Sequence, residues 1–219
     1  TLRHNLASER LLHYKEGKTA LVSVVQGADE DLFFSCNGKV EADSTPRSMV
    51  LQRMMGHLPM LFHPDASRVV NIGLGAGVTF GALGCYPVDH LEVVEIEPAV
   101  REVVRIWGKR NHHILDHPKA LVTINDGRNH LFATAEGYDV ITSDPFEPVM
   151  AGAANLYTVE HFRQARMRLY DDGIMCQYLP LYELSREDYS SILRSFVNVF
   201  PRSVLFFVGF DTIILGLND

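Results

Sequence analysis

Short apolar runs alternate with segments of helical spacing from Ser67 to the end of the chain, and this alternation restricts the possible fold most. The apolar runs predict strands at 68–73, 91–96, 120–124, 138–143 and 173–179. Helical spacing predicts helices at 77–84, 98–108, 128–134, 158–169 and 186–199. Alternating strands and helices form a parallel sheet with right-handed crossovers. The sequence therefore predicts a doubly wound, Rossmann-like α/β domain.

Two further apolar runs, SVLFFVGF and TIILGL, close the chain and are separated by little more than Asp211. This connection is too short for a crossover helix, so the two strands must be antiparallel to each other. A seven-stranded, mainly parallel sheet with one reversed strand resembles the class-I S-adenosylmethionine-dependent methyltransferases.

The N-terminal part of the chain has a different pattern. Short β-branched runs between about 11 and 36 are separated by Gly17, Gly27 and Gly38, which predicts a small antiparallel sheet. Apolar residues at helical spacing then predict a helix that starts at Pro46. We therefore divide the chain into an N-terminal β-strand region, residues 1–45, and an α/β catalytic domain, residues 46–219.

Composition excludes several classes of protein. The formal net charge of −7 argues against a nucleic-acid partner, because phosphate binding needs clustered Lys and Arg. No apolar run reaches the roughly 20 residues that span a bilayer, and no signal peptide is present, which favours a cytoplasmic location. Three widely spaced cysteines predict free thiols in a reducing compartment. The histidines within 112–117 either bind a metal or form a solvated helix end, and we expect no metal site.

The sharpest local motif is VVNIGLGAGVT, which carries Gly73, Gly75 and Gly77 between a buried strand and a helix. Glycines at such a turn let a ligand approach the backbone closely. Val78 stands where the dinucleotide fingerprint needs its third glycine. The GxGxG pattern is instead typical of S-adenosylmethionine-binding folds, although it also suits a plain tight turn.

Acidic residues follow the next two strands. Glu95 ends the second strand and is our candidate for binding the ribose hydroxyls. Asp126 and Gly127 follow the third strand, where an acid reaches the adenine amino group in this class of fold. Glu97 has an alternative role as an acid before a helix N-terminus, and Asp126 as a helix N-cap. Together with the glycine turn, these strand ends predict an adenosine-type site.

The fourth strand ends in YDVITSDPFEP, which places Asp144 and Glu147 three residues apart on a proline-stiffened loop. This loop lies where the reacting end of a bound nucleoside is expected. The pair predicts acid–base or amine-binding chemistry. The alternative is a capped turn formed by the Asp-Pro sequence.

This loop and the Asn155-Leu156-Tyr157 that follows it resemble the signature of the spermidine synthase family. The order of small sheet, GHLPML helix, glycine turn, VEIEP, DGR and acidic loop resembles that family along nearly the whole chain. It resembles in particular the spermidine-synthase-like proteins that are often fused to a membrane domain. The start at Thr1 fits a longer protein with such a domain in its N-terminal portion.

The resemblance implies transfer of an aminopropyl group from decarboxylated S-adenosylmethionine to a diamine such as putrescine. It implies a homodimer, a small-molecule amine substrate and no permanently bound cofactor. Asp144 would be the base or amine anchor, with Glu147 in the place of a second aspartate. Gln52 would lie near the nucleoside, while Tyr157 and Tyr178 would line the acceptor pocket, where Tyr178 serves packing equally well.

Two departures from the family leave alternatives open. Ala76 stands where the family has an acid that binds the aminopropyl ammonium, and Leu51-Gln52-Arg53 replaces a tyrosine-histidine-glutamate triplet. A methyltransferase that uses ordinary S-adenosylmethionine is therefore one alternative. A non-catalytic nucleoside-binding module of a larger membrane protein is the other.

Overall fold

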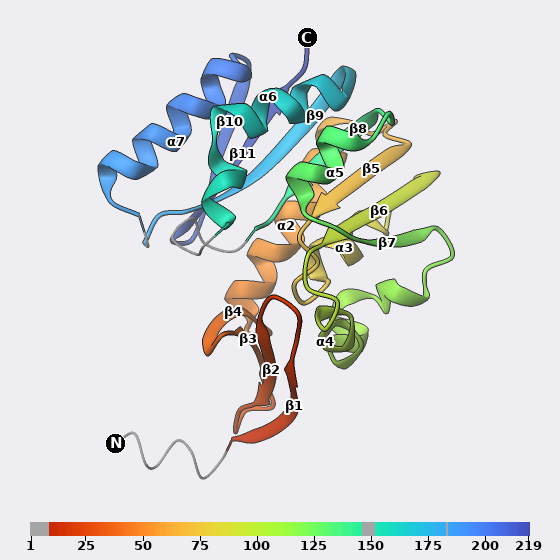
Figure 1. The fold of residues 1–219 in the computed structure, drawn as a ribbon, viewed down its shortest axis with the longest axis vertical. Helices are drawn as coiled ribbons and strands as arrows, with labels where there is room; N and C mark the ends of the chain where they lie inside the picture. Colours follow the sequence, from red (N-terminus) through yellow and green to blue (C-terminus); the bar gives the residue numbers. More distant parts are fainter. Residues whose placement is uncertain (1–8, 146–151, 183) are drawn as a thin grey trace.

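The computed structural model describes residues 9–145, 152–182 and 184–219, which form two sheets (Figure 1). The small sheet is fully antiparallel and contains β1 (Arg10–Glu16), β2 (Leu21–Gln26), β3 (Leu32–Cys36) and β4 (Lys39–Asp43). The large sheet has the order β10-β11-β9-β8-β5-β6-β7. Its strands are β5 (Arg68–Ile72), β6 (His90–Glu95), β7 (Ala120–Ile124), β8 (Tyr138–Ser143), β9 (Leu169–Pro180), β10 (Ser203–Val208) and β11 (Asp211–Leu217).

The pairing in the large sheet confirms the predicted fold class. The strands from β7 through β9 pair in parallel, and β11 is antiparallel to both of its neighbours. The last two strands are antiparallel to each other, as their short connection predicts. The single reversed strand, β11, therefore starts at the edge where the parallel strands end.

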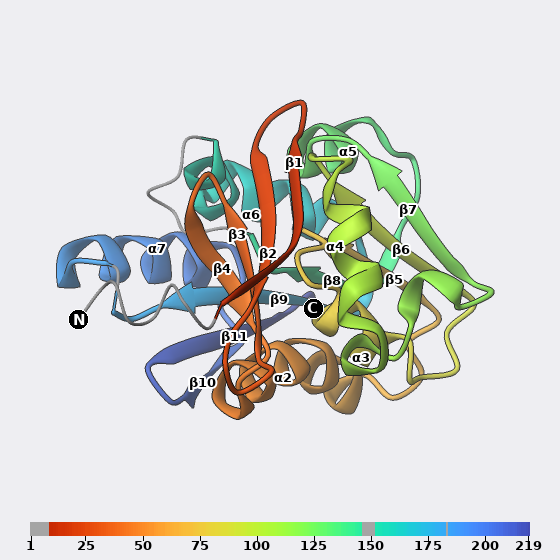
Figure 2. The same ribbon diagram turned by 90° about the horizontal axis from the view of Figure 1, so that it is seen from below.

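Helices cover both faces of the large sheet (Figure 2). One face carries α2 (Pro46–Phe62), α3 (Val78–Leu83) and α4 (Val100–Trp107), and the other carries α5 (Gly127–Ala133), α6 (Val159–Arg168) and α7 (Arg186–Val199). Each face has its own apolar core. Trp107 of α4 is fully buried in the first of these cores. The small sheet contributes Val22 and Phe34 to the core that holds α2, α3 and α4.

β4 and the first residues of β9 were not predicted from the sequence. Asn37 and Gly38 both have positive φ (52° and 84°) and form a tight hairpin between β3 and β4. An Asn-Gly pair is a strong hairpin signal and could have predicted this turn. β9 begins at Leu169 instead of 173 because it also pairs with Tyr138 beyond a bulge.

The predicted division at 45/46 falls between β4 and the first residue of α2. Cys36 and Cys176 are buried and Cys85 is exposed, and all three are free thiols. In the part of the chain that the structure describes, no helix combines the length and apolarity needed to cross a membrane.

Candidate active site

A cavity of about 660 Å³ opens at the carboxyl edge of the large sheet. The glycine turn after β5, the ends of β8 and β9 and the start of β11 form one side of it, and β4 and the start of α2 form the other. Its described lining residues include four carboxylates and one guanidinium: Glu41, Asp43, Asp144, Asp211 and Arg47. This balance favours a cationic ligand.

The glycine turn has the backbone geometry of a ligand-binding loop. Gly73, Gly75 and Gly77 all have positive φ, at 91°, 49° and 78°. The buried Asn111 side chain donates a hydrogen bond to the Ala76 carbonyl at 2.9 Å and so fixes the turn. A Cβ on Gly75 would meet no atom within 4 Å, and Gly75 lines the cavity. The backbone is therefore open to a ligand at Gly75.

Replacement of Gly75 by alanine is expected to weaken binding of the predicted S-adenosyl nucleoside by about 10-fold or more, since the methyl group enters the cavity. The left-handed φ of a non-glycine residue also costs roughly 1–2 kcal/mol of stability. Gly38→Ala is the matched control, because Gly38 has φ 84°, equal free space around its Cβ and no place in the cavity. Calorimetric titration should show weakened binding for Gly75→Ala alone. Equal affinities in the two variants would place the nucleoside elsewhere.

Glu95 and Asp126 make backbone contacts in the structure. Buried Glu95 accepts hydrogen bonds from Leu74 N (2.9 Å) and Glu97 N (2.8 Å), and burial raises its pKa. It thus ties the glycine turn to the end of β6. Asp126 accepts from Arg128 N at 2.8 Å as the N-cap of α5, the alternative considered from the sequence. Neither acid lines the cavity, nor does Gly127, so their nucleoside-binding roles remain predictions.

Asp144 follows β8 and lines the cavity. Its Oδ2 is 2.8 Å from the Thr79 hydroxyl, which is also 3.0 Å from the Gln52 carbonyl oxygen. One hydroxyl proton cannot serve two acceptors. Ionised Asp144 accepts that proton, whereas protonated Asp144 donates to Thr79, which then donates to Gln52. The Thr79 hydroxyl therefore accommodates both charge states.

The pKa of Asp144 is raised to about 6. Burial of the carboxylate is the largest cause; the hydrogen bond from Thr79 opposes it, and repulsion from Asp211 adds to it. A pKa near the working pH suits a group that exchanges a proton with its ligand. Asp144 is thus ionised at neutral pH but protonates more readily than an exposed aspartate.

The structure brings only some of the other predicted site residues to the cavity. Gln52 lines it and donates to Asp43 O at 3.1 Å, and Tyr178 lines it with its hydroxyl directed to Asp211. Tyr157 is buried in the core beside α6 and α7 and is not among the lining residues. Glu147 lies outside the described residues. The roles of these residues in binding remain predictions.

Sequence reasoning missed Thr79, Asp211 and the acids of β4. Thr79 lies two residues after Gly77, the last glycine of the turn, and Asp211 is an isolated acid between two apolar strands, so both positions could have been singled out from the sequence. Glu41 and Asp43 reach the cavity only because the small sheet packs against α2, which no local pattern predicts. Ala76 lines the cavity, whereas Arg53 is exposed and does not.

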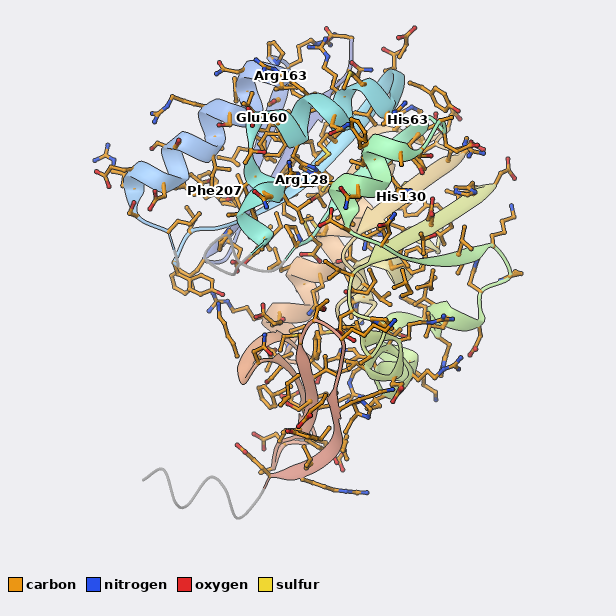
Figure 3. The ribbon with its side chains drawn as sticks, viewed as in Figure 1. His63, Arg128, His130, Glu160, Arg163 and Phe207 are labelled. Carbon is orange, nitrogen blue, oxygen red and sulfur yellow. The ribbon has the colours of Figure 1, made fainter. Side chains whose placement is uncertain are left out.

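Charged side chains elsewhere do not belong to this site. Arg128 on α5 and Glu160 and Arg163 on α6 lie in the half of the molecule away from the small sheet (Figure 3), and none of them lines the cavity. His112 and His113 have left-handed φ and are therefore not the consecutive helical residues that a metal site there needs. Within the described residues, no cluster of His, Cys, Asp or Glu could hold a metal ion.

The sheet topology, the glycine turn and the carboxylate-lined cavity together define a methyltransferase-like α/β transferase. Residues 48–212 match the spermine/spermidine synthase domain, and the chain belongs to this family. It is 25% identical over 209 residues to a polyamine aminopropyltransferase of Bacillus cytotoxicus, covering 95% of this chain and 75% of that protein. It is 28% identical over 169 residues to the Bacillus subtilis polyamine aminopropyltransferase, covering 77% of this chain and 61% of that protein.

Two solved structures share the fold. One is a spermidine synthase in complex with the transition-state analogue AdoDATO, with a TM-score of 0.84 and 21% identity over 96% of this chain and 74% of that chain. The other is the Thermotoga maritima spermidine synthase, with a TM-score of 0.83 and 22% identity, covering 96% of this chain and 73% of that chain. Both likenesses extend over nearly the whole chain, so the small sheet belongs to the shared fold.

Proposed function

We propose that the protein transfers an aminopropyl group from decarboxylated S-adenosylmethionine to a diamine such as putrescine. The observation that carries this proposal is the placement of Asp144, with its raised pKa, in an acidic cavity beside the glycine turn. The relatives named polyamine aminopropyltransferase support the reaction type. The spermidine synthase with a bound transition-state analogue supports the same type of ligand.

The reaction is a displacement at the methylene carbon beside a sulfonium. The neutral amine nitrogen forms a bond to that carbon while the carbon–sulfur bond breaks, and its electron pair stays on sulfur as a neutral thioether. Because the leaving group is already good, the protein contributes mainly by aligning the two reactants. The attacking nitrogen then carries a positive charge and loses a proton.

Asp144 serves this reaction in two ways. Its carboxylate attracts the ammonium form of the acceptor into the cavity and accepts a proton from it. The raised pKa of about 6 narrows the gap between Asp144 and a primary amine, whose pKa is about 10. The Thr79 hydroxyl holds Asp144 in place before and after the proton arrives. Glu147 remains our candidate for a second carboxylate on the same loop.

Ala76 is the observation that favours methyl transfer from ordinary S-adenosylmethionine, since the turn lacks an acid there. That co-substrate carries a carboxylate, which needs a cationic partner. Arg47 is the one cation among the described lining residues, and its guanidinium stacks on the Phe210 ring at 4.4 Å. Four carboxylates around the same cavity oppose an anionic group, so we place methyl transfer second.

The test is a transfer assay with the full chain, putrescine and each co-substrate, followed by mass spectrometry of the amine product. Formation of spermidine from the decarboxylated co-substrate supports the proposal. Formation of a methylated amine from S-adenosylmethionine would replace it by methyl transfer. If neither product forms and neither nucleoside binds in calorimetry, a non-catalytic role follows.

We also infer a homodimer from the family resemblance, a cytoplasmic location from the widely spaced cysteines, and a division of the chain at residue 45/46 from the change in sequence pattern. Light scattering after size-exclusion chromatography tests the dimer. A measured mass of 24.6 kDa, that of a single chain, would contradict it. Limited proteolysis tests the division. A fusion to a membrane domain, as in the spermidine-synthase-like proteins that the sequence resembles, stays a prediction.

A further inference from the structure

Asp211 occupies a fixed position in the cavity wall. It is the first residue of β11 and pairs with Val208 across a two-residue turn formed by Gly209 and Phe210. Gly209 has φ 67°, the left-handed conformation that a tight hairpin turn requires. The Asp211 residue is 8% exposed and pairs on its other side with Pro180 of β9. The hairpin therefore presents this carboxylate at one defined place.

Tyr178 orients the Asp211 carboxylate. Its buried hydroxyl donates a hydrogen bond to Asp211 Oδ1 at 2.9 Å, and both residues line the cavity. Burial is the main cause of the raised pKa of Asp144 and of Tyr178, and the negative charge of Asp211 raises both further, so the three groups share one electrostatic environment. Two nearby carboxylates repel each other, which raises the pKa of one of them. A cation that lies between the two groups relieves this repulsion.

The strand order places Asp211 on the acceptor side of Asp144. The glycine turn follows β5, Asp144 follows β8, Tyr178 lies on β9 and Asp211 starts β11, in that spatial order. β8 and β11 both flank β9, so their axes are roughly 10 Å apart, two strand spacings. This distance fits a short diamine that makes a hydrogen bond of about 3 Å at each end.

We propose that Asp211, oriented by Tyr178, binds the distal ammonium of the acceptor while Asp144 receives the attacking amine. This role rests on the proposed aminopropyl transfer and makes the site selective for diamines over monoamines. The turn that carries Ala76 supplies no carboxylate, so β11 provides the second acidic contact on the opposite side of Asp144. Asp211 is thereby a specificity-determining residue and not a proton carrier.

The test compares two acceptors of equal chain length, putrescine and n-butylamine, which lacks the distal amine. We expect Asp211→Asn to lower kcat/KM for putrescine at least about 30-fold, because a cation loses its buried charged partner. Its kcat/KM for n-butylamine should change far less than that for putrescine, because this acceptor has no distal ammonium for Asp211 to bind and only the influence of Asp211 on Asp144 is lost. Tyr178→Phe should show a smaller loss, mainly in KM for putrescine, because only the orientation of Asp211 is affected.

Asp171→Asn is the matched control, since Asp171 lies on β9, is exposed and does not line the cavity. This variant should keep the kcat/KM of the parent protein for both acceptors. If Asp211→Asn leaves the preference for putrescine intact, or lowers kcat/KM equally for both acceptors, the proposed specificity role is wrong. Aminopropyl transfer would not be affected by that result. If the parent protein transfers no aminopropyl group at all, the proposed function fails, and this inference fails with it.

Discussion

Replacement of Asp144 by asparagine is expected to lower aminopropyl transfer by about 10²-fold or more and to leave nucleoside binding intact. The amide keeps the size of the side chain and its contact with Thr79 Oγ1, which is 2.8 Å away in the parent protein. It cannot attract an ammonium ion or accept its proton. The loss should therefore appear in turnover and in acceptor KM, while the nucleoside binds the glycine turn as before.

The same variant is expected to be more stable than the parent protein at neutral pH. The folded pKa of Asp144 is about 6, above the ordinary value of 3.8, so folding penalises the charged form. The shift corresponds to about 3 kcal/mol at most, and about 1–2 kcal/mol is realistic because the side chain is only partly buried. The penalty is complete above about pH 6 and disappears below about pH 4, where both states are protonated.

Thermal melts at pH 7.5 and pH 4 test the expected gain in stability of Asp144→Asn. The transfer assay with mass spectrometry tests the expected loss of aminopropyl transfer. The melting temperature of Asp144→Asn should exceed that of the parent at pH 7.5, and the two should converge at pH 4. Asp171→Asn, the exposed control, should melt like the parent at both values. Unchanged turnover in Asp144→Asn would remove Asp144 from the mechanism, and a lower melting temperature would show that its burial is not penalised.

The large sheet was predictable because each of its strands has a local signal. Buried parallel strands give continuous apolar runs, and the short link at Asp211 determines the direction of the last strand. The cavity was predictable where a residue follows a strand, as Asp144 does, because parallel strands end at one edge. Glu41 and Asp43 were not predictable in this way, because their place depends on how a separate sheet docks.

The acids at the ends of β6 and β7 show a second limit of sequence reasoning. A carboxylate at a strand end can bind a ligand or hold backbone N–H groups, and both uses favour the same residue type at the same position. Asp126 caps the N-terminus of α5, and Glu95 accepts a hydrogen bond from Leu74 N. The sequence pattern would be the same if either carboxylate bound a ligand instead. Side-chain partners decide between these uses, and those become visible only with the assembled fold.

Glu97 should be the strongest single polar contribution to the docking of the small sheet. It is 1% exposed and accepts hydrogen bonds from Thr19 N (2.6 Å), Thr19 Oγ1 (2.9 Å) and Ala20 N (3.2 Å) in the β1–β2 turn. It also accepts from Ala99 N at 2.9 Å. Burial alone would raise the pKa of Glu97, but these donors outweigh burial and lower it to about 2.

Glu97→Gln is therefore expected to destabilise the protein by about 2–3 kcal/mol at neutral pH, since the amide must face donors with an NH₂ group. The folded pKa lies below the ordinary value of 4.5, so the contribution is present above about pH 4.5 and is lost as the pH falls toward 2. Urea unfolding at pH 7 and pH 3 measures this change. Glu102→Gln is the control, because Glu102 also links the small sheet to α4, through Lys15, but on the exposed surface.

The functional effect of Glu97→Gln follows from a continuous chain of contacts. Thr19 donates to Glu97, Glu97 N donates to Glu95, and Glu95 accepts from Leu74 in the glycine turn. The small sheet also carries Glu41 and Asp43 to the cavity. At a temperature where the variant is folded, both nucleoside affinity and acceptor KM should therefore worsen by several fold. A stability loss with unchanged binding of both substrates would show that Glu97 only fastens the sheet, and that the cavity keeps its shape without it.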